Sequence, residues 1–362
     1  MPCESGNTRS CRSVDACSRF PYAPTVSAAR DAYGYGMEQF DPMDDRWWTA
    51  GSSLNWWDST SPVRPAWVPG HDESVAALRR DLKLVLATLR QVHQYRTVDT
   101  GSLAMLDPAL PANPASLLYT RMVGAGILEL GLPIPTGGKA VGNPKYSPFA
   151  ALRLPAHRRL ETPLLRLGFT PVDIASLGPG PLRGARQYDR HNLICVSLAL
   201  TARRAGWRTW GEAYGRFSLM TGDPLMGSGG PDLMLQGETG WCAVELTASA
   251  GQTLEEKFRR WDRVLAHPGC PPMDVLWLDA SRDHTLLDPL KGLAAARPHQ
   301  HAGSAAAWRD TLACDDGFRM EPGTPPPLPD WMRSNVERLA ALVGFPDASG
   351  WRIPPRINGR YR

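Results

Sequence analysis

The feature that most restricts the fold of this chain is the order of its apolar runs after residue 186. Apolar residues recur at helical spacing over 189–206, and short apolar runs follow at 208–214, 231–235 and 241–246. Gly237 and Gly240 lie between the last two runs and predict a hairpin. A helix over 254–265 and a strand over 274–278 follow. The predicted order, helix, strand, strand, strand, helix, strand, indicates a mixed α+β or α/β domain over residues 186–290.

A different order is predicted upstream, over residues 73–155. Apolar residues from Val75 to Val92 recur at helical spacing and predict one long helix that ends near residue 95. A second helix is predicted over 100–106. A third begins after Asn113, which is a suitable N-cap, and ends at Gly124.

Two strands are predicted after the third helix, at 127–130 and 146–154, with a glycine-rich loop between them. Three helices followed by strand, loop and strand resemble a winged helix-turn-helix domain. In that domain the third helix enters the major groove of DNA and basic residues of the loop contact the backbone. The residues that this resemblance places on DNA are Ser116, Tyr119, Thr120, Arg121, Lys139 and Lys145.

Positive charge is concentrated in the same region. Residues 73–160 carry eleven Lys or Arg and five acidic residues, whereas the whole chain has a formal net charge of only +4. A basic block in a nearly neutral chain indicates a polyanion-binding module, and we expect double-stranded DNA as the partner. The alternatives are a solvated basic helix face and a winged helix used for contact with another protein.

Two acidic residues are candidates for chemistry in the second domain. Asp232 stands at the start of the second strand, and Glu245 lies 13 residues later, near the end of the third. This placement resembles the PD-(D/E)xK nuclease fold, in which two carboxylates on adjacent strands converge to hold Mg²⁺. Such a cation lowers the pKa of a bound water molecule and neutralises charge on a phosphate. A carboxylate among apolar neighbours is costly to bury alone, so Glu245 either binds a cation or pairs with an arginine.

The lysine of that fold is missing from its usual position, two residues after the glutamate, where this chain has Thr247. A threonine can hydrogen-bond a water molecule but brings no positive charge. Lys257 lies at the border of the apolar stripe of the 254–265 helix, and its long stem can reach inward. The expected catalytic set is Asp232, Glu245, Thr247 and Lys257. The alternative for Lys257 is a surface position in which it pairs with Glu256 or with solvent.

Two more polar residues complete a pattern over residues 75–280. His191 opens the first helix of the second domain, and Glu212 follows Trp210 before Pro231-Asp232. With the upstream winged helix, this order resembles the replication-relaxation family of bacterial plasmid and phage proteins. The resemblance implies a DNA-associated role in plasmid replication, relaxation or transfer. We expect Glu212 to assist Asp232 and Glu245 in holding the metal.

The remaining segments are less regular. Residues 1–72 are rich in Ser, Pro, Gly and Asp and predict a disordered or loosely ordered lead. Its five tryptophans indicate docking on a protein partner or, preferably, on the chain itself. Residues 156–185 are expected to form a linker. Residues 291–362 are expected to form an extension with a helix over 331–343 and a basic end.

Composition excludes two classes of protein. Seven cysteines without a C-x-x-C pair do not form the framework of a secreted disulfide-rich domain. The longest apolar stretches fall far short of the ~20 residues of a membrane helix, and the first 20 residues contain no apolar leader. We therefore expect a cytoplasmic protein without membrane contact.

Together these patterns predict a DNA-binding protein that hydrolyses phosphodiesters with Mg²⁺, and a homodimer is one assembly that this function allows. The alternatives are an inactive DNA-binding or partner-binding module and a transcriptional regulator whose second domain senses a ligand.

Overall fold

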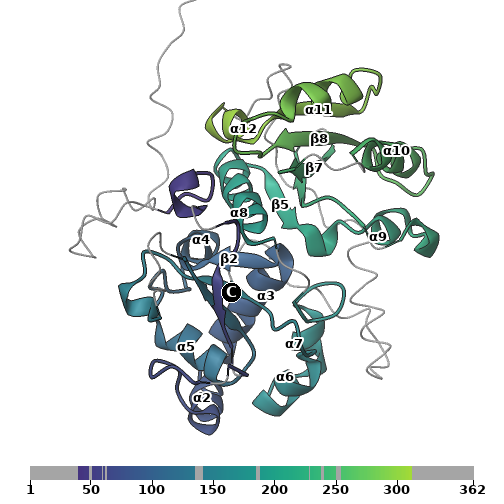
Figure 1. The fold of residues 1–362 in the computed structure, drawn as a ribbon. Helices are drawn as coiled ribbons and strands as arrows, with labels where there is room; N and C mark the ends of the chain where they lie inside the picture. Colours follow the sequence, from purple (N-terminus) through teal and green to yellow (C-terminus); the bar gives the residue numbers. More distant parts are fainter. Residues whose placement is uncertain are drawn as a thin grey trace, which may run out of the picture. The chain divides into compact units, whose positions relative to one another are not determined.

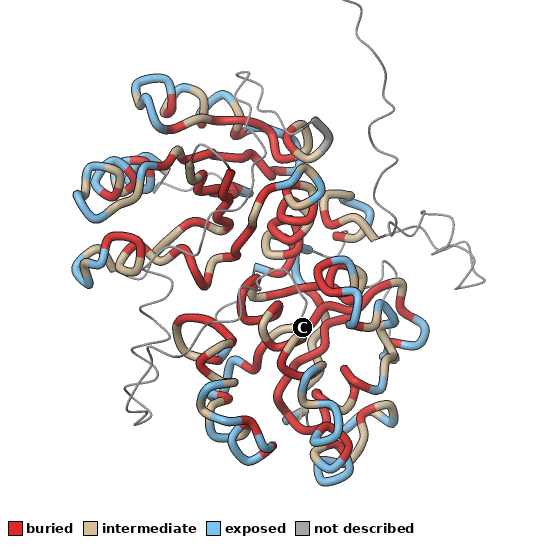
Figure 2. Tube along the Cα trace, turned by 180° about the vertical axis from the view of Figure 1, so that it is seen from behind, coloured by how far each residue is buried: buried red, intermediate tan, exposed pale blue. Residues whose placement is uncertain are grey.

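The computed structural model describes residues 40–48, 51–58, 60–61, 63–134, 142–184, 188–227, 229–237, 240–249 and 254–311. Within these residues, helices and strands form a mixed α+β fold with two sheets, which confirms the predicted class (Figure 1). Buried residues follow the strands and the inner sides of helices, and exposed residues gather on the outer turns (Figure 2).

The first sheet has four antiparallel strands in the order β1-β3-β4-β2. The upstream order along the chain is α3 (Leu82–Tyr95), β2 (Thr97–Asp99), α4 (Thr100–Leu106), α5 (Leu117–Gly124), β3 (Glu129–Leu132) and β4 (Ala151–Arg153). Strand β2 was not predicted, because three residues are too few to show a period. It pairs with β4, so the chain between α3 and α4 is part of the sheet.

The prediction of one long helix up to residue 95 is wrong, because the structure has α2 (His71–Leu78) and α3 in its place. The backbone N–H of Asp81 donates to the carbonyl of Leu78 (2.9 Å), and the Asp81 carbonyl accepts from Val85 (3.1 Å). The chain therefore turns between the helices. Apolar residues on both helices pack into the same core, which explains why the helical spacing continues across the turn.

The third predicted helix is shorter than expected. Asn113 caps only a preceding turn, in which its Oδ1 accepts from the N–H of Ala115 (2.9 Å). The helix N-cap is Ser116, whose Oγ accepts from the N–H of Leu118 (3.3 Å). The strands that follow are also short, and the start of the predicted 146–154 strand belongs to the 3-10 helix η3 (Pro144–Tyr146).

The second sheet has five strands in the order β5-β6-β7-β8-β9. Strands β5 (Arg208–Gly211), β6 (Leu233–Gln236) and β7 (Trp241–Thr247) are antiparallel neighbours, whereas β8 (Met273–Asp279) and β9 (Gln300–Ser304) run parallel to β7. Helix α8 (Asp189–Arg204) precedes β5, and α10 (Leu254–Leu265) connects β7 with β8. The predicted order is therefore present, and α11 (Leu287–Ala294) and β9 extend it.

The two faces of the second sheet belong to different hydrophobic cores. One face contributes residues such as Leu233 and Val244 to a cluster that also contains Val196 of α8 and Leu152 of the first sheet. We call this cluster the shared core. The other face contributes Met234, Ala243 and Trp277 to a second cluster with Phe258 and Trp261 of α10. Because successive residues of a strand point to opposite faces, this alternation fixes where the polar residues of β7 point.

Part of the expected loosely ordered lead packs on the rest of the chain. Residues 40–58 include η2 (Asp45–Trp48) and β1 (Asn55–Trp57), which pairs with β3. At the start of α8, Asp189 Oδ2 accepts from the backbone N–H of Leu54 and from the indole N–H of Trp56, both at 2.9 Å. Lys139, residues 331–343 and the basic end at 351–362 lie outside the described residues.

The expected linker holds two short helices, and other short helices lie in the second half of the chain. The remaining elements are α6 (Glu161–Leu167), α7 (Pro171–Ala175), η4 (Glu212–Tyr214), α9 (Phe217–Thr221), η5 (Pro224–Met226) and α12 (Ala305–Thr311).

Candidate active site

Asp232 and Glu245 lie side by side at one end of β6 and β7. The ladder pairs Leu233 with Val244, and it continues one residue further because the N–H of Asp232 donates to the Val244 carbonyl (3.0 Å). Glu245 shares its face of β7 with Ala243 and Thr247, the face that α10 covers. The sequence pattern therefore placed these two carboxylates on neighbouring strands correctly.

Each carboxylate is held by a helix. Asp232 Oδ1 lies 2.9 Å from Nε2 of His191 on α8, and its Oδ2 accepts from the backbone N–H of Leu246 (2.7 Å). Glu245 Oε1 accepts from the indole N–H of Trp261 on α10 (2.8 Å). The sequence indicates His191 as a polar residue of this domain, but its contact with Asp232 depends on the packing of α8.

The two carboxyl groups have opposite electrostatic environments. Burial and the neighbouring Asp232 raise the pKa of Glu245 to about 8, although Lys257 and Trp261 act against this. Burial alone would also raise the pKa of Asp232, but the charge and hydrogen bond of His191 hold it below its ordinary value. Burial alone would lower the pKa of His191, but Asp232 and Cys195 raise it well above the ordinary value. Asp232 and His191 thus form an ion pair beside a carboxyl group that gives up its proton with difficulty.

Lys257 and Thr247 lie near these carboxylates without touching them. Lys257 is exposed on α10, and its charge lowers the pKa of both Asp232 and Glu245. Among the described residues, its ammonium group makes no hydrogen bond or ion pair, so its exposed position agrees with the surface alternative in contact with solvent and not with pairing to Glu256. Thr247 is 6% exposed, and its Oγ1 is buried without a hydrogen-bond partner among the described residues. A buried hydroxyl of this kind requires a partner such as a water molecule or a ligand.

Glu212 is not joined to the other two carboxylates. It begins η4, one residue beyond the β5 residue that pairs with Leu233, and its Oε1 accepts from Nη2 of Arg96 (3.3 Å). In the described part of the chain, Asp232, Glu245 and Glu212 do not bring their ligand atoms within 4.8 Å of one another. The structure thus sets Asp232 beside Glu245 and joins Asp232 to His191, whereas Thr247 and Lys257 contact neither carboxylate.

The residues expected on DNA have unequal exposure. Tyr119 is fully buried, with its hydroxyl donating to the Pro111 carbonyl (2.6 Å), and Thr120 is also buried. Neither presents its side chain to a ligand in this structure, because α5 packs against α2 and the shared core. Ser116 and Arg121 are half-buried, and Ser116 is the cap of α5. Lys145 is exposed in η3 beside Tyr146, with its Nζ 5.8 Å from the ring centroid.

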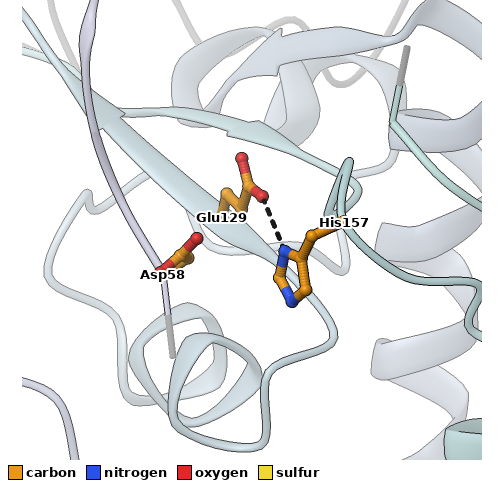
Figure 3. A group of neighbouring side chains, drawn as sticks. All are labelled: Asp58, Glu129 and His157. Carbon is orange, nitrogen blue, oxygen red and sulfur yellow. Dashed lines mark ion pairs between the residues drawn. The ribbon is translucent and has the colours of Figure 1, made fainter. Parts of the chain in front are cut away.

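A separate group could hold a metal ion by geometry. Ligand atoms of Asp58, Glu129 and His157 lie within 4.8 Å of one another (Figure 3). However, Glu129 is already bound to Nε of Arg153 (2.5 Å), and Asp58 accepts from the N–H and hydroxyl of Thr60 (2.7 and 2.8 Å). A cation would compete with these donors. We interpret Glu129, Arg153 and His157 as an ion-pair network that ties β3 to β4 and to the segment after β4.

No protein-family model, curated protein or solved structure matches this chain. Among the helices of the described residues, none has the length and apolar character needed to cross a membrane.

Proposed function

We propose that this chain binds DNA and hydrolyses phosphodiester bonds with the help of a divalent cation, as the resemblance to the replication-relaxation family implies. The observation that carries the proposal is the pair Asp232 and Glu245 on neighbouring strands, with Lys257 close enough to lower the pKa of both. Buried carboxylates next to each other are costly unless positive charge compensates them.

The topology supports both halves of the proposal. The order from α8 through β5, β6, β7 and α10 to β8, with β7 and β8 parallel, is the order expected of a PD-(D/E)xK domain. The order from α3 through β2, α4 and α5 to β3 and β4 is the order expected of a winged helix. Fold resemblance alone does not define function, so the residues of the site carry the proposal.

The residues present fit a hard divalent cation. The donors are carboxylate oxygens, and Mg²⁺ is commonly bound by one or two carboxylates together with water and substrate phosphate. Glu245 Oε1 and both oxygens of Asp232 have partners, whereas no contact engages Glu245 Oε2 among the described residues. Asp232 and Glu245 would hold Mg²⁺. When bound, Mg²⁺ lowers the pKa of water and neutralises charge on the phosphate.

The side chains around the carboxylates have separate roles in this reaction. His191 and the Leu246 N–H fix the orientation of Asp232, and Trp261 fixes Glu245. Lys257 attracts the phosphate and orients the attacking water. The hydroxyl of Thr247 hydrogen-bonds the same water molecule. A bond forms between the water oxygen and phosphorus as the P–O ester bond breaks. One strand end keeps the phosphate, and the other leaves as a hydroxyl after taking a proton.

One observation favours a second candidate, a module that binds DNA without cutting it. Thr247 replaces the lysine that this fold normally carries on the same strand, and the substitute Lys257 makes no contact with either carboxylate. In that case Asp232 and His191 form a structural ion pair, and Lys139 and Lys145 contribute to binding through the DNA backbone.

The test is a cleavage assay with supercoiled plasmid, linear duplex and single-stranded DNA in EDTA, Mg²⁺ or Mn²⁺. Asp232→Asn keeps an acceptor for the Leu246 N–H but removes the charge. Asp288→Asn, on the exposed side of α11, is the matched control. Metal-dependent cutting that Asp232→Asn loses and Asp288→Asn keeps supports hydrolysis.

Binding without cutting in any metal would leave the second candidate. Lys145→Glu should then weaken binding and reduce its salt dependence. Absence of both binding and cutting would overturn both candidates.

A further inference from the structure

One arginine contacts a carboxylate next to the candidate active site, and a second arginine lies four residues further along the chain from that carboxylate. Arg96 follows α3, and Arg216 follows η4, with Glu212 between them. Gly211 pairs with Leu233 across β5 and β6. Glu212 follows Gly211 and Asp232 precedes Leu233, so these two residues lie beside each other at the end of the antiparallel pair. The backbone of Arg216 also packs against Gly230, where an added Cβ would lie 3.1 Å from its Cα.

Arg96 is held in an unusual conformation. Its φ of 68° lies in the left-handed region, which residues other than glycine rarely adopt. Its side chain is 11% exposed, Nη2 donates to Glu212 (3.3 Å), and Nε is buried without a partner among the described residues. Strained backbone and unsatisfied buried donors persist where the surrounding structure holds them, and they are concentrated at functional sites.

Arg216 has a half-buried guanidinium with spare hydrogen-bonding capacity. The guanidinium forms no hydrogen bond or ion pair with the residues that the structure describes, whereas the backbone carbonyl accepts from Leu219 and Met220. The guanidinium lies against Gly180, which has a φ of +90°, and an added Cβ there would be 2.4 Å from Nη2. Its pKa is lowered by burial and by the charge of Arg96. Arg96 thus contacts the carboxylate of Glu212, and the charge of that carboxylate counteracts the lowering of the pKa of Arg216.

His93 reports the same excess of positive charge. Its Nε2–H donates to the Pro179 carbonyl (2.9 Å), and burial together with the charges of Arg96 and Arg216 lowers its pKa to about 3. A neutral histidine, two arginines and one glutamate leave a net charge of about +1 next to the carboxylates. Guanidinium groups with free N–H donors match phosphate oxygens in both charge and geometry.

We propose that Arg96 and Arg216 bind a backbone phosphate of the nucleic acid, next to the phosphodiester that Asp232 and Glu245 would receive. This inference rests on the proposed function, since it assumes that the chain's ligand is DNA. In this proposal the DNA strand is positioned by one residue from the first half of the protein chain and one from the second half.

The test measures binding of a fluorescein-labelled single-stranded oligonucleotide and of a labelled duplex by anisotropy, in EDTA and over a range of salt concentrations. Arg216→Ala removes the free guanidinium, and Arg216→Lys keeps the charge without the fork of donors. Arg263→Ala removes the same charge from the outer side of α10 and is the matched control. Circular dichroism and thermal unfolding verify that each variant is folded.

Arg216→Ala should weaken binding roughly 10-fold or more, because hydrogen bonds to charged groups are among the stronger ones. It should also reduce the slope of log K against log[salt] by about 0.7 for the single strand or about 0.9 for the duplex. Arg216→Lys should restore most of the slope, and Arg263→Ala should change little. Equal effects of Arg216→Ala and Arg263→Ala would overturn this inference.

This binding experiment does not test the proposed hydrolysis, because binding is measured without metal. Loss of slope in Arg216→Ala, together with absence of metal-dependent cutting by the wild type, would support the phosphate site and overturn hydrolysis. If the wild type does not bind either oligonucleotide, both proposals are overturned.

Discussion

The buried carboxyl group of Glu245 makes the stability of the protein depend on pH in a defined direction. Its pKa is about 8 in the folded protein, against an ordinary value of 4.5. Since the folded state disfavours the charged form, stability should fall as pH rises from 4.5 towards 8. Each pKa unit corresponds to about 1.4 kcal/mol, so the full effect is roughly 5 kcal/mol for this 7% exposed side chain.

Glu245→Gln removes this titration while keeping an oxygen that can accept from Trp261. The variant should match the wild type near pH 4.5 and exceed it by several kcal/mol at pH 9, measured by urea unfolding in EDTA. His191 also loses stabilising charge as pH rises, because its pKa is raised by Asp232. The difference between the two proteins therefore reports the titration of Glu245 together with its effect on Asp232 and His191.

Mg²⁺ adds a second arm to the same experiment. A ligand at 100 times its Kd stabilises the folded state by about 2.7 kcal/mol. At pH 8, Mg²⁺ should therefore raise the free energy of unfolding of the wild type more than that of Glu245→Gln. Parallel pH profiles for wild type and variant would refute the reasoning about the buried carboxyl group. Equal stabilisation of both proteins by Mg²⁺ would refute the role of Glu245 as a ligand.

Three further predictions concern the packing around the site. Gly211→Ala should destabilise the protein by about 1–3 kcal/mol or more in thermal unfolding, because the added Cβ would stand 2.2 Å from the carbonyl oxygen of Gln94; an unchanged Tm would contradict this. Phe258→Ala should cost about 3–5 kcal/mol in urea unfolding, because the ring is fully buried, and a loss under 1 kcal/mol would show that the cavity collapses. Because the pKa of His93 is lowered to about 3, wild-type stability should fall as pH drops below 6.5, and His93→Gln should show a flatter acid limb. If the stability of the wild type and of His93→Gln falls identically below pH 6.5, His93 is not neutral in the folded protein.

The spacing of apolar residues predicted those helices and strands that face a hydrophobic core over several helical turns or several strand positions. The helix Leu254–Leu265 has the bounds that the sequence indicated, and the hairpin of β6 and β7 follows from Gly237 and Gly240. Strand β9 escaped prediction because Gln300–Ser304 lacks apolar alternation and is a strand only through its pairing with β8. The same holds for β1, whose partner β3 lies more than 70 residues away.

The candidate site was predictable only where its residues share a strand or neighbouring strands. Asp232, Glu245 and Thr247 follow from the alternation of β6 and β7, and Lys257 follows from the stripe of α10. The contact between His191 and Asp232 requires the packing of α8, and no periodicity encodes it. Arg96 and Glu212 are 116 residues apart, so only the folded chain brings their side chains together.

The shared core has a consequence for how this protein can be divided. Val85 of α3, Leu152 of the first sheet, Val196 of α8 and Leu276 of the second sheet belong to one buried cluster. A fragment that stops at residue 155 would expose the apolar faces that α8 and the second sheet now cover, and such surfaces promote aggregation. Because the two sheets share this core, we expect them to unfold together in a single transition and neither half to fold alone.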